Sequence, residues 1–160
     1  MQFNHNEKAS GIYEMSSSYG NMAAIRSMRG CNMRLHNCEI NGTSMTAGAY
    51  GLVAHTYGCI DVRDGLQISG KFSTSAISAG VHSYIRIPSL VTYVNTPQAT
   101  ANISAYIHSS IYVQGGSFTG NFSGISYYLR TNSNLIYDTS ITIPGSTGNK
   151  DASSNYIPAN

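Results

Sequence analysis

The sequence has few charged residues and no tryptophan. Asp, Glu, Lys and Arg make up only 10% of its 160 residues, against about a quarter in an ordinary soluble domain. The formal net charge is +2 and the basic residues form no run, so nothing in the composition favours nucleic-acid binding. No segment approaches the roughly 18 consecutive apolar residues of a membrane span, and we expect no membrane insertion.

Cysteine is also scarce, with Cys31, Cys38 and Cys59 as its only positions. Three cysteines cannot build a complete disulfide framework, and we expect buried free thiols. A metal site formed by Cys31, His36 and Cys38 is the alternative. Structural zinc usually takes four ligands that include a close cysteine pair, and the sequence offers no second pair. We therefore predict neither a metal nor another cofactor.

The N-terminal segment, MQFNHNEKAS, lacks the charged and apolar regions of a secretion signal. Either the protein leaves the cell by another route, as virion proteins do by lysis, or Met1 begins a trimmed chain. The sequence leaves these two alternatives open.

Serine, asparagine and glycine are abundant, with 23, 14 and 16 residues, and the chain is internally repetitive. An apolar residue recurs near the end of each repeat at intervals of 25 to 28 residues. The positions are Ile12, Ile40, Ile68, Tyr93, Phe118 and Ile143. All but the first are followed two residues later by Gly or Asn, which tolerate a left-handed backbone at low cost.

Two further series share this period. One series is Met33, Ile60, Ile85, Ile111 and Leu135, and each member has a second apolar residue or tyrosine two positions later. The other series is Ile25, Leu52, Ile77, Ile103 and Ile125. Apolar pairs with a period of two are typical of strand faces. Three short strands in each unit of about 25 residues predict an all-β fold, a parallel β-solenoid of about five coils.

The repeats also suggest how the chain is organised. We expect residues 1–10 to be a polar lead-in and residues 11–145 to form a single elongated solenoid domain. The remaining stretch, residues 146–160, is rich in Ser, Asn and Gly and has no period. It is predicted to be an extended polar tail, ordered only where it lies on something else.

Stacking places residues of successive coils about 4.8 Å apart. One outward position then carries, coil by coil, Arg34, Asp61, Arg86, Tyr112 and Ile136. Two interpretations remain open. The acid can alternate with the two arginines simply to avoid like-charge repulsion between neighbouring strands. Alternatively, Arg34, Asp61, Arg86 and Tyr112 form a strip that contacts a polar ligand.

Aromatic residues and histidines recur in nearby columns. One column contains Tyr84 between Cys59 and Ser110, and another contains His82 and His108, with His55 displaced by two residues. These side chains are either ordinary surface residues or part of a site. Histidine titrates near neutral pH and can act as an acid or base. Tyrosine, with 12 residues, can stack on sugar rings or pack in interfaces.

Repeats of this length, with Ile-x-Ile or Ile-x-Val core pairs, Gly or Asn turns, low charge and many Ser, Asn and Tyr residues, resemble a known architecture. It is the right-handed parallel β-helix of bacteriophage tailspikes and tail fibres and of pectate-lyase-like proteins. The resemblance covers about residues 11–145. It implies a single-stranded right-handed parallel β-helix that belongs to a homotrimeric virion adhesin, found in the phage tail or extracellularly. Its expected partner is a bacterial surface polysaccharide.

This resemblance leaves two functions open. For adhesion, the predicted ligand-binding residues are Arg34, Asp61, Arg86, Tyr112, Tyr84, His82 and His108. For a polysaccharide depolymerase, a hydrolase would use Asp61 with Asp64 or Asp138, because a retaining pair of carboxyls lies about 5 Å apart and an inverting pair lies further apart. A lyase would instead use His82, His108 or Tyr112 with Arg86. The sequence does not decide whether the protein is an enzyme.

Overall fold

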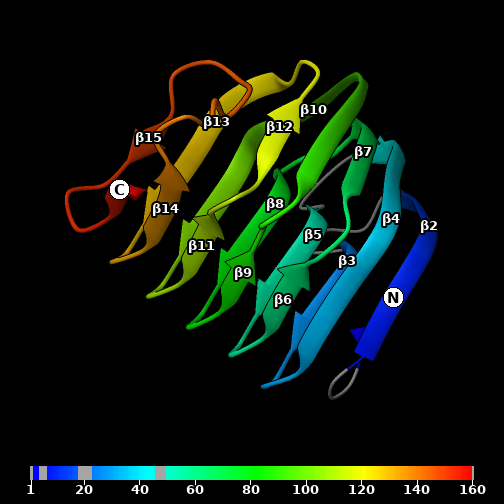
Figure 1. Ribbon diagram of the computed structural model, residues 1–160, viewed down its shortest axis with the longest axis horizontal. Coiled ribbons are helices and arrows are strands. Elements are labelled where there is room, and N and C mark those ends of the chain that lie inside the picture. The colour runs from blue at the N-terminus through cyan, green and yellow to red at the C-terminus, as the bar shows by residue number, and fades with distance from the viewer. Residues whose placement is uncertain (1, 4–6, 18–22, 46–49, 160) are drawn as a thin grey trace.

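The computed structural model describes residues 2–3, 7–17, 23–45 and 50–159, and the side chains of residues 23–42 and 50–158. Across these ranges the chain contains strands and no helix, and the strands pair in parallel into a β-solenoid of about 5 turns. Figure 1 shows the coils stacked side by side, with β2 (Glu7–Ser17) at one end and β15 (Asn149–Lys150) towards the other. The predicted all-β solenoid is confirmed.

Each coil contributes to three rows of parallel strands, which we call faces 1, 2 and 3. Face 1 consists of β1 (Gln2–Phe3), β3 (Ala23–Met28), β5 (Tyr50–His55), β8 (Ser75–Gly80), the second half of β10 (Leu90–Tyr106), β13 (Ser123–Arg130) and β15. Face 2 consists of the first parts of β2 and β4 (Asn32–Met45), then β6 (Cys59–Val62), β9 (Tyr84–Arg86), β11 (Ser110–Val113), β14 (Asn134–Asp138) and β16 (Asn155–Ala159). Face 3 consists of the later parts of β2 and β4, then β7 (Leu66–Lys71), the first half of β10 and β12 (Ser117–Thr119).

The core series of face 2 is confirmed along its whole length. Met33, Ile60, Ile85, Ile111 and Leu135 are partners on successive strands, and each is at most 1% exposed. Alternation along each strand sends these side chains inward and their neighbours outward. Burying each such side chain contributes about 1.5–3 kcal/mol before conformational entropy is counted. This ladder therefore holds the coils of face 2 in one register.

The other two series are correct only in part. On face 3, Ile40, Ile68 and Tyr93 are partners as predicted, but Phe118 pairs with Val91. The pairing of β10 with β7 shifts register between Val94 and Gln98, and the backbone turns left-handed at Asn95 and Thr96. After this irregularity the spacing between partners grows from 25 residues (93 − 68) to 26 (112 − 86), and it reaches 27 at Phe118 (118 − 91). Phe118 is therefore displaced by two positions, which a constant spacing cannot anticipate.

Two more expected core partners are also displaced. Ile12 pairs with Glu39 instead of Ile40, after a register shift between Ala9 and Gly11. On face 1, Ile125 pairs with Ala101, and Tyr127 takes the predicted place beside Ile103. Here the shift falls between Gln98 and Ala101 of β10. A constant spacing does not anticipate these shifts of register.

The two ends of the chain differ from the expected lead-in and tail. At the N-terminus, β1 pairs with β3, and β2 begins at Glu7, inside the predicted lead-in. At the C-terminus, β15 pairs with β13 and β16 pairs with β14. Ser154 is 1% exposed, and Tyr156 stacks between Tyr127 and Tyr137 at centroid distances of 4.3 and 4.2 Å. The described part of residues 146–160 therefore continues the solenoid, because stacked rings replace the aliphatic residues that marked earlier coils.

The corner from face 1 to face 2 has an unusual backbone. At this corner two consecutive residues that are not glycine adopt positive φ angles in four successive coils. The pairs are Thr56–Tyr57, Val81–His82, Ile107–His108 and Thr131–Asn132. Left-handed backbone is costly for β-branched residues such as Val81 and Ile107, so it persists only where the surroundings impose it.

Buried serines at the next position help to impose this corner. The hydroxyl of Ser83 donates to the carbonyl of Gly80 at 2.7 Å, and that of Ser109 donates to the carbonyl of Tyr106 at 2.7 Å. Ser109 Oγ also accepts the backbone N–H of Ser83 from the preceding coil at 3.2 Å. Each serine thus closes its own turn and ties it to a neighbouring coil. The result is a corner at which the second left-handed residue projects outward.

Candidate functional site

The outward column of face 2 lies in the order that the sequence predicts. Strand pairing places Asp61 beside Arg34 on one side and beside Arg86 on the other. Tyr112 follows Arg86, and Ile136 follows Tyr112. The four residues Arg34, Asp61, Arg86 and Tyr112, which we call the face 2 strip, therefore lie on four neighbouring strands. Both arginines are exposed, whereas Asp61 and Tyr112 are half-buried.

Asp61 forms an ion pair with Arg63, which is not one of the two arginines that stacking places beside it. Arg63 Nη2 lies 2.6 Å from Asp61 Oδ2, and the side chain of Asp61 is only 15% exposed. Arg63 is two residues further along the same coil, so it points outward beside Asp61. The other carboxylate oxygen, Oδ1, is buried and has no hydrogen-bond partner among the residues that the structure describes. Asp61 thus lies mostly beneath the surface of the strip, where its Oδ2 fixes the guanidinium of Arg63.

Aromatic rings extend the strip. The rings of Tyr84 and Tyr112 lie 4.9 Å apart at 44°. Burial raises the pKa of Tyr84, and the positive charge of Arg86 partly opposes this effect. Tyr84 is therefore neutral at ordinary pH, and its hydroxyl can both donate and accept a hydrogen bond.

A second group of rings stands at the corner between faces 1 and 2. Tyr57 stacks on His82 with centroids 5.3 Å apart, and His82 stacks on His108 at 5.1 Å. Tyr57 is 62% exposed, and both histidines are exposed. We call these three residues the corner ladder. Each ring projects from the second residue of a left-handed pair.

Tyr57 is a site residue that the sequence reasoning missed. His55 was placed beside this column, but it lies at the end of β5 on face 1, where its Nδ1 is 2.7 Å from the hydroxyl of Thr56. The sequence signal for Tyr57 is the small residue that follows it, because the tight corner requires a small residue at that position. Aligning Gly58 with Ser83 and Ser109 would have placed Tyr57 in the ladder.

Asp138 lies apart from Asp61, the candidate catalytic aspartate with which the sequence paired it. Asp138 is on β14, and β9 and β11 separate this strand from β6, which carries Asp61. Three strand spacings amount to about 14 Å, which exceeds the separation of a hydrolase carboxylate pair. Asp138 instead accepts the backbone N–H of Gly115 at 2.6 Å.

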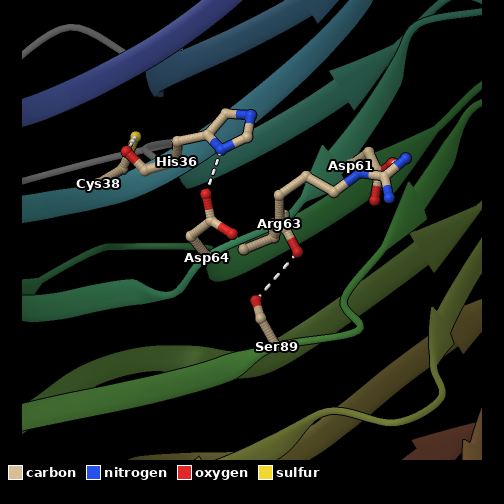
Figure 2. Close-up of polar contacts among 7 residues, drawn as sticks. His36, Cys38, Asp61, Arg63, Asp64 and Ser89 are labelled. Atoms are coloured by element: carbon tan, nitrogen blue, oxygen red, sulfur yellow. Dashed lines mark hydrogen bonds and ion pairs between the residues drawn. The ribbon is translucent and has the colours of Figure 1, made fainter.

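Asp64 has a different partner, His36. Figure 2 shows His36 Nδ1 and Asp64 Oδ2 in contact, with the side chain of Arg63 directed to Asp61 instead. Both members are accessible, because the side chain of His36 is 24% exposed and that of Asp64 is 53% exposed. A carboxylate in this position holds the imidazole in one orientation.

Asp64 also borders a hollow of about 340 Å³ at the start of face 3. Glu39 lines the same hollow, together with the amides of Asn37 and Gln67 and the hydroxyl of Thr92. We call this the face 3 hollow. Neither Glu39 nor His36 was a predicted catalytic residue. Their proximity to Asp64 depends on how the chain turns from face 2 to face 3, which no residue spacing reveals.

The described part of the chain shows no group of three His, Cys, Asp or Glu residues that could hold a metal ion. Cys31, Cys38 and Cys59 are free thiols, the first two buried and the third half-buried.

Within the residues that the structure describes, no helix is long and apolar enough to cross a membrane. Comparison of the chain with protein-family models, curated proteins and solved structures finds no match. The fold and the side chains are thus the grounds for any functional proposal.

Proposed function

We propose that the protein is the β-helical segment of a phage tailspike or tail fibre, and that it attaches the virion to a bacterial surface polysaccharide. One observation carries this proposal: stacked and tilted aromatic rings stand on the outer surface beside exposed arginines and the half-buried carboxylate of Asp61. Sugars present apolar ring faces and many hydroxyls. Such a surface offers both aromatic stacking and hydrogen bonding.

The face 2 strip and the corner ladder together form the proposed binding surface. The corner residues precede face 2 by only a few positions in every coil, so the two groups adjoin. Low charge suits this role, because few ionic groups of the protein need desolvation when a hydroxyl-rich polymer binds. A homotrimer, as proposed for the intact spike, would present three such surfaces. It would raise the effective affinity for a repetitive glycan without a new contact.

Replacing an aromatic residue of this surface is expected to weaken binding to the host polysaccharide. Tyr112→Ala and His82→Ala should each raise the Kd about tenfold, which corresponds to about 1.4 kcal/mol of lost contact. Biolayer interferometry on purified polysaccharides from candidate hosts measures this change. Tyr128→Ala is the matched control, because Tyr128 lies on face 1 with Arg130 over its ring and belongs to neither group.

Two results would contradict the adhesion proposal. One is that Tyr112→Ala, His82→Ala and Tyr128→Ala all bind with the Kd of the wild-type protein. The other is that the wild-type protein binds no surface polysaccharide from a panel of hosts. Light scattering on the same samples should give the mass of a trimer. A stable monomer would contradict the trimeric assembly while leaving the binding surface to be judged by the affinities.

A polysaccharide depolymerase is the second candidate, and the face 3 hollow supports it. Glu39 and Asp64 supply two carboxyl groups to one hollow, amides and a hydroxyl surround them, and His36 contacts Asp64. Paired carboxyls are the chemistry that glycoside hydrolysis uses. In this candidate the hollow takes over the role that the sequence assigned to Asp61 with Asp64. The lyase alternative keeps Arg86 and Tyr112, which are partners on neighbouring strands.

If the protein cleaves its polysaccharide, Glu39→Gln and Asp64→Asn should each lower the rate about 10²- to 10⁴-fold while binding is retained. Release of new reducing ends measures hydrolysis, and absorbance of an unsaturated product measures elimination. Loss of cleavage in Asp61→Asn or Arg86→Ala, with Asp64→Asn fully active, would contradict the face 3 hollow and move the site to face 2.

A further inference from the structure

Face 1 carries a second hollow, which is lined by no residue of the face 2 strip or the corner ladder. It measures about 350 Å³, which is at the small end of the range for ligand sites. Arg26 from β3, Tyr50 and His55 from β5 and Tyr106 from β10 form its walls. Val53 and Ser78 lie at its base and are 3% and 0% exposed. We call it the face 1 hollow.

The hollow exists because one strand has only small outward side chains. Strand β8 carries Ser75, Ser78 and Gly80 on this side, between larger residues of β5 and β10. A Cβ atom on Gly80 would come within 2.9 Å of the His55 ring and 3.3 Å of the Tyr106 ring. The two rings therefore close over the glycine. Any larger residue at position 80 would push them apart and open this wall.

The hydroxyls of Ser78 and Tyr106 line one side of the hollow, and buried serines behind them connect to these hydroxyls. Tyr106 Oη lies 2.6 Å from Ser104 Oγ and 3.3 Å from Ser78 Oγ, and Ser75 Oγ donates to Ser104 Oγ at 2.7 Å. The pKa of Tyr50 is raised to about 12, mainly because the side chain is buried and also because Tyr106 lies next to it. Tyr50 thus stays neutral and keeps its hydroxyl proton. The network can reorient its protons to donate to a ligand or accept from it.

Charge on this face is of one sign. None of the 7 acidic residues of the chain lies in a described strand of face 1, whereas Arg26, Arg130 and Lys150 do. Burial, and then the charge of Arg26, lower the pKa of His55, so this histidine is neutral at neutral pH. Arg26 is half-buried at the wall of the hollow. Its charge therefore acts in a partly desolvated place, where it is screened less than a surface charge.

We infer that the face 1 hollow binds a carboxylate-bearing sugar unit of the polysaccharide. The guanidinium of Arg26 pairs with the carboxylate, for which its planar fork is well matched. The hydroxyl network and His55 bind the sugar hydroxyls, and the tyrosine rings pack against the sugar ring. This inference rests on the proposed glycan-binding function and names the chemistry of the glycan.

The position of the hollow connects it with the proposed adhesion surface. His55 is two residues before Tyr57 of the corner ladder, and Tyr106 is two residues before His108. A glycan that reaches from the hollow across the corner would arrive at the rings of Tyr84 and Tyr112. Face 1 then selects an acidic unit, and the corner and face 2 bind the neighbouring units.

The test uses a glucuronate-containing oligosaccharide and the same oligosaccharide after reduction of its carboxyl groups. Calorimetric titration of the full chain should show the acidic form binding about tenfold more tightly. Arg26→Gln should abolish this difference. Arg130→Gln removes the same charge from the same face, outside the hollow and over the ring of Tyr128, and should preserve it. Equal losses in the two variants would show diffuse electrostatics and overturn the inference.

Chemical-shift changes in the wild-type protein give a second measurement that does not depend on the folding of a variant. The acidic oligosaccharide should shift the amides of β3, β5 and β8, and shifts confined to other strands would overturn the inference. If both forms bind equally and Tyr112→Ala abolishes binding, the adhesion proposal stands and the acidic site fails. If the acidic form binds in the hollow and Tyr112→Ala has no effect, the acidic site stands and the face 2 surface fails.

Discussion

Gly70→Ala should be among the most destabilising single substitutions in this chain. Gly70 on β7 is the partner of Gly42 on β4, and its φ angle is +85°. A Cβ atom at position 70 would lie 1.8 Å from the carbonyl oxygen of Gly42 and 2.5 Å from its carbonyl carbon. Both atoms belong to the backbone, so no side-chain rotation relieves the overlap.

The expected loss has two parts. A left-handed backbone at a residue other than glycine costs about 1–3 kcal/mol. Forcing one coil away from the next adds about 1–3 kcal/mol more, as for other overpacked sites. The sum of about 2–6 kcal/mol is a large share of the roughly 5–15 kcal/mol that stabilises a typical domain. Urea unfolding followed by circular dichroism measures it, with wild type and variant at the same protein concentration.

Gly30→Ala separates the two parts. Gly30 also has a left-handed backbone, with a φ angle of +77°, but a Cβ atom there would meet no atom within 4 Å. Only the conformational part should appear, about 1–2 kcal/mol. Equal losses in Gly30→Ala and Gly70→Ala would mean that the contact between coils at Gly42 and Gly70 contributes nothing.

The sequence predicted face 2 better than face 1 or face 3, for a physical reason. Face 2 strands are short and follow a corner of constant length, two left-handed residues and a small residue, so sequence spacing translates directly into register. Face 3 runs into β10, whose bend at Asn95 and Thr96 adds residues that a constant period does not contain. Displacements of Phe118 and Ile125 follow from β10, and periodicity alone has no means to locate them.

The same distinction applies to the candidate sites. The order Arg34, Asp61, Arg86, Tyr112 needed only register, and it was correct. The pairing of Asp61 with Arg63 needed side-chain conformations. The two hollows needed three-dimensional shape, because one depends on how a corner brings Asp64 to Glu39 and the other on a lone glycine between two rings. A site formed by residues at equivalent positions of successive coils can be predicted from the repeat. A site formed at a corner or in a hollow cannot.

Asn102→Ala should produce the second large loss of stability. Asn102 is on β10 and is 0% exposed, although it is polar. Its Oδ1 accepts the hydroxyl of Tyr93, and its Nδ2 donates to the carbonyl of Pro144 at 2.9 Å. The alanine variant leaves the buried hydroxyl of Tyr93 and the carbonyl of the half-buried Pro144 without partners, and each costs about 1–3 kcal/mol. We expect a loss of about 2–6 kcal/mol, measured by urea unfolding.

Tyr93→Phe tests whether this interior bond, and not merely the volume of Asn102, stabilises the fold. Burial raises the pKa of Tyr93, so the ring remains neutral and its hydroxyl proton needs an acceptor. Tyr93→Phe alone leaves Asn102 Oδ1 unsatisfied and should cost about 1–3 kcal/mol. Tyr112→Phe, which removes a half-buried hydroxyl from face 2, is the control and should change stability by less than about 0.5 kcal/mol.

The double variant of Tyr93→Phe with Asn102→Ala decides the question. Once both partners are gone, neither leaves the other unpaired, and only the carbonyl of Pro144 has lost its donor. The combined loss should therefore fall short of the sum of the single losses by about 0.5–3 kcal/mol, the range for residues that share a bond. Additive losses would mean that the two side chains act independently. In that case Asn102 would stabilise the solenoid through Pro144 alone, by holding the last turn of face 3 against β10.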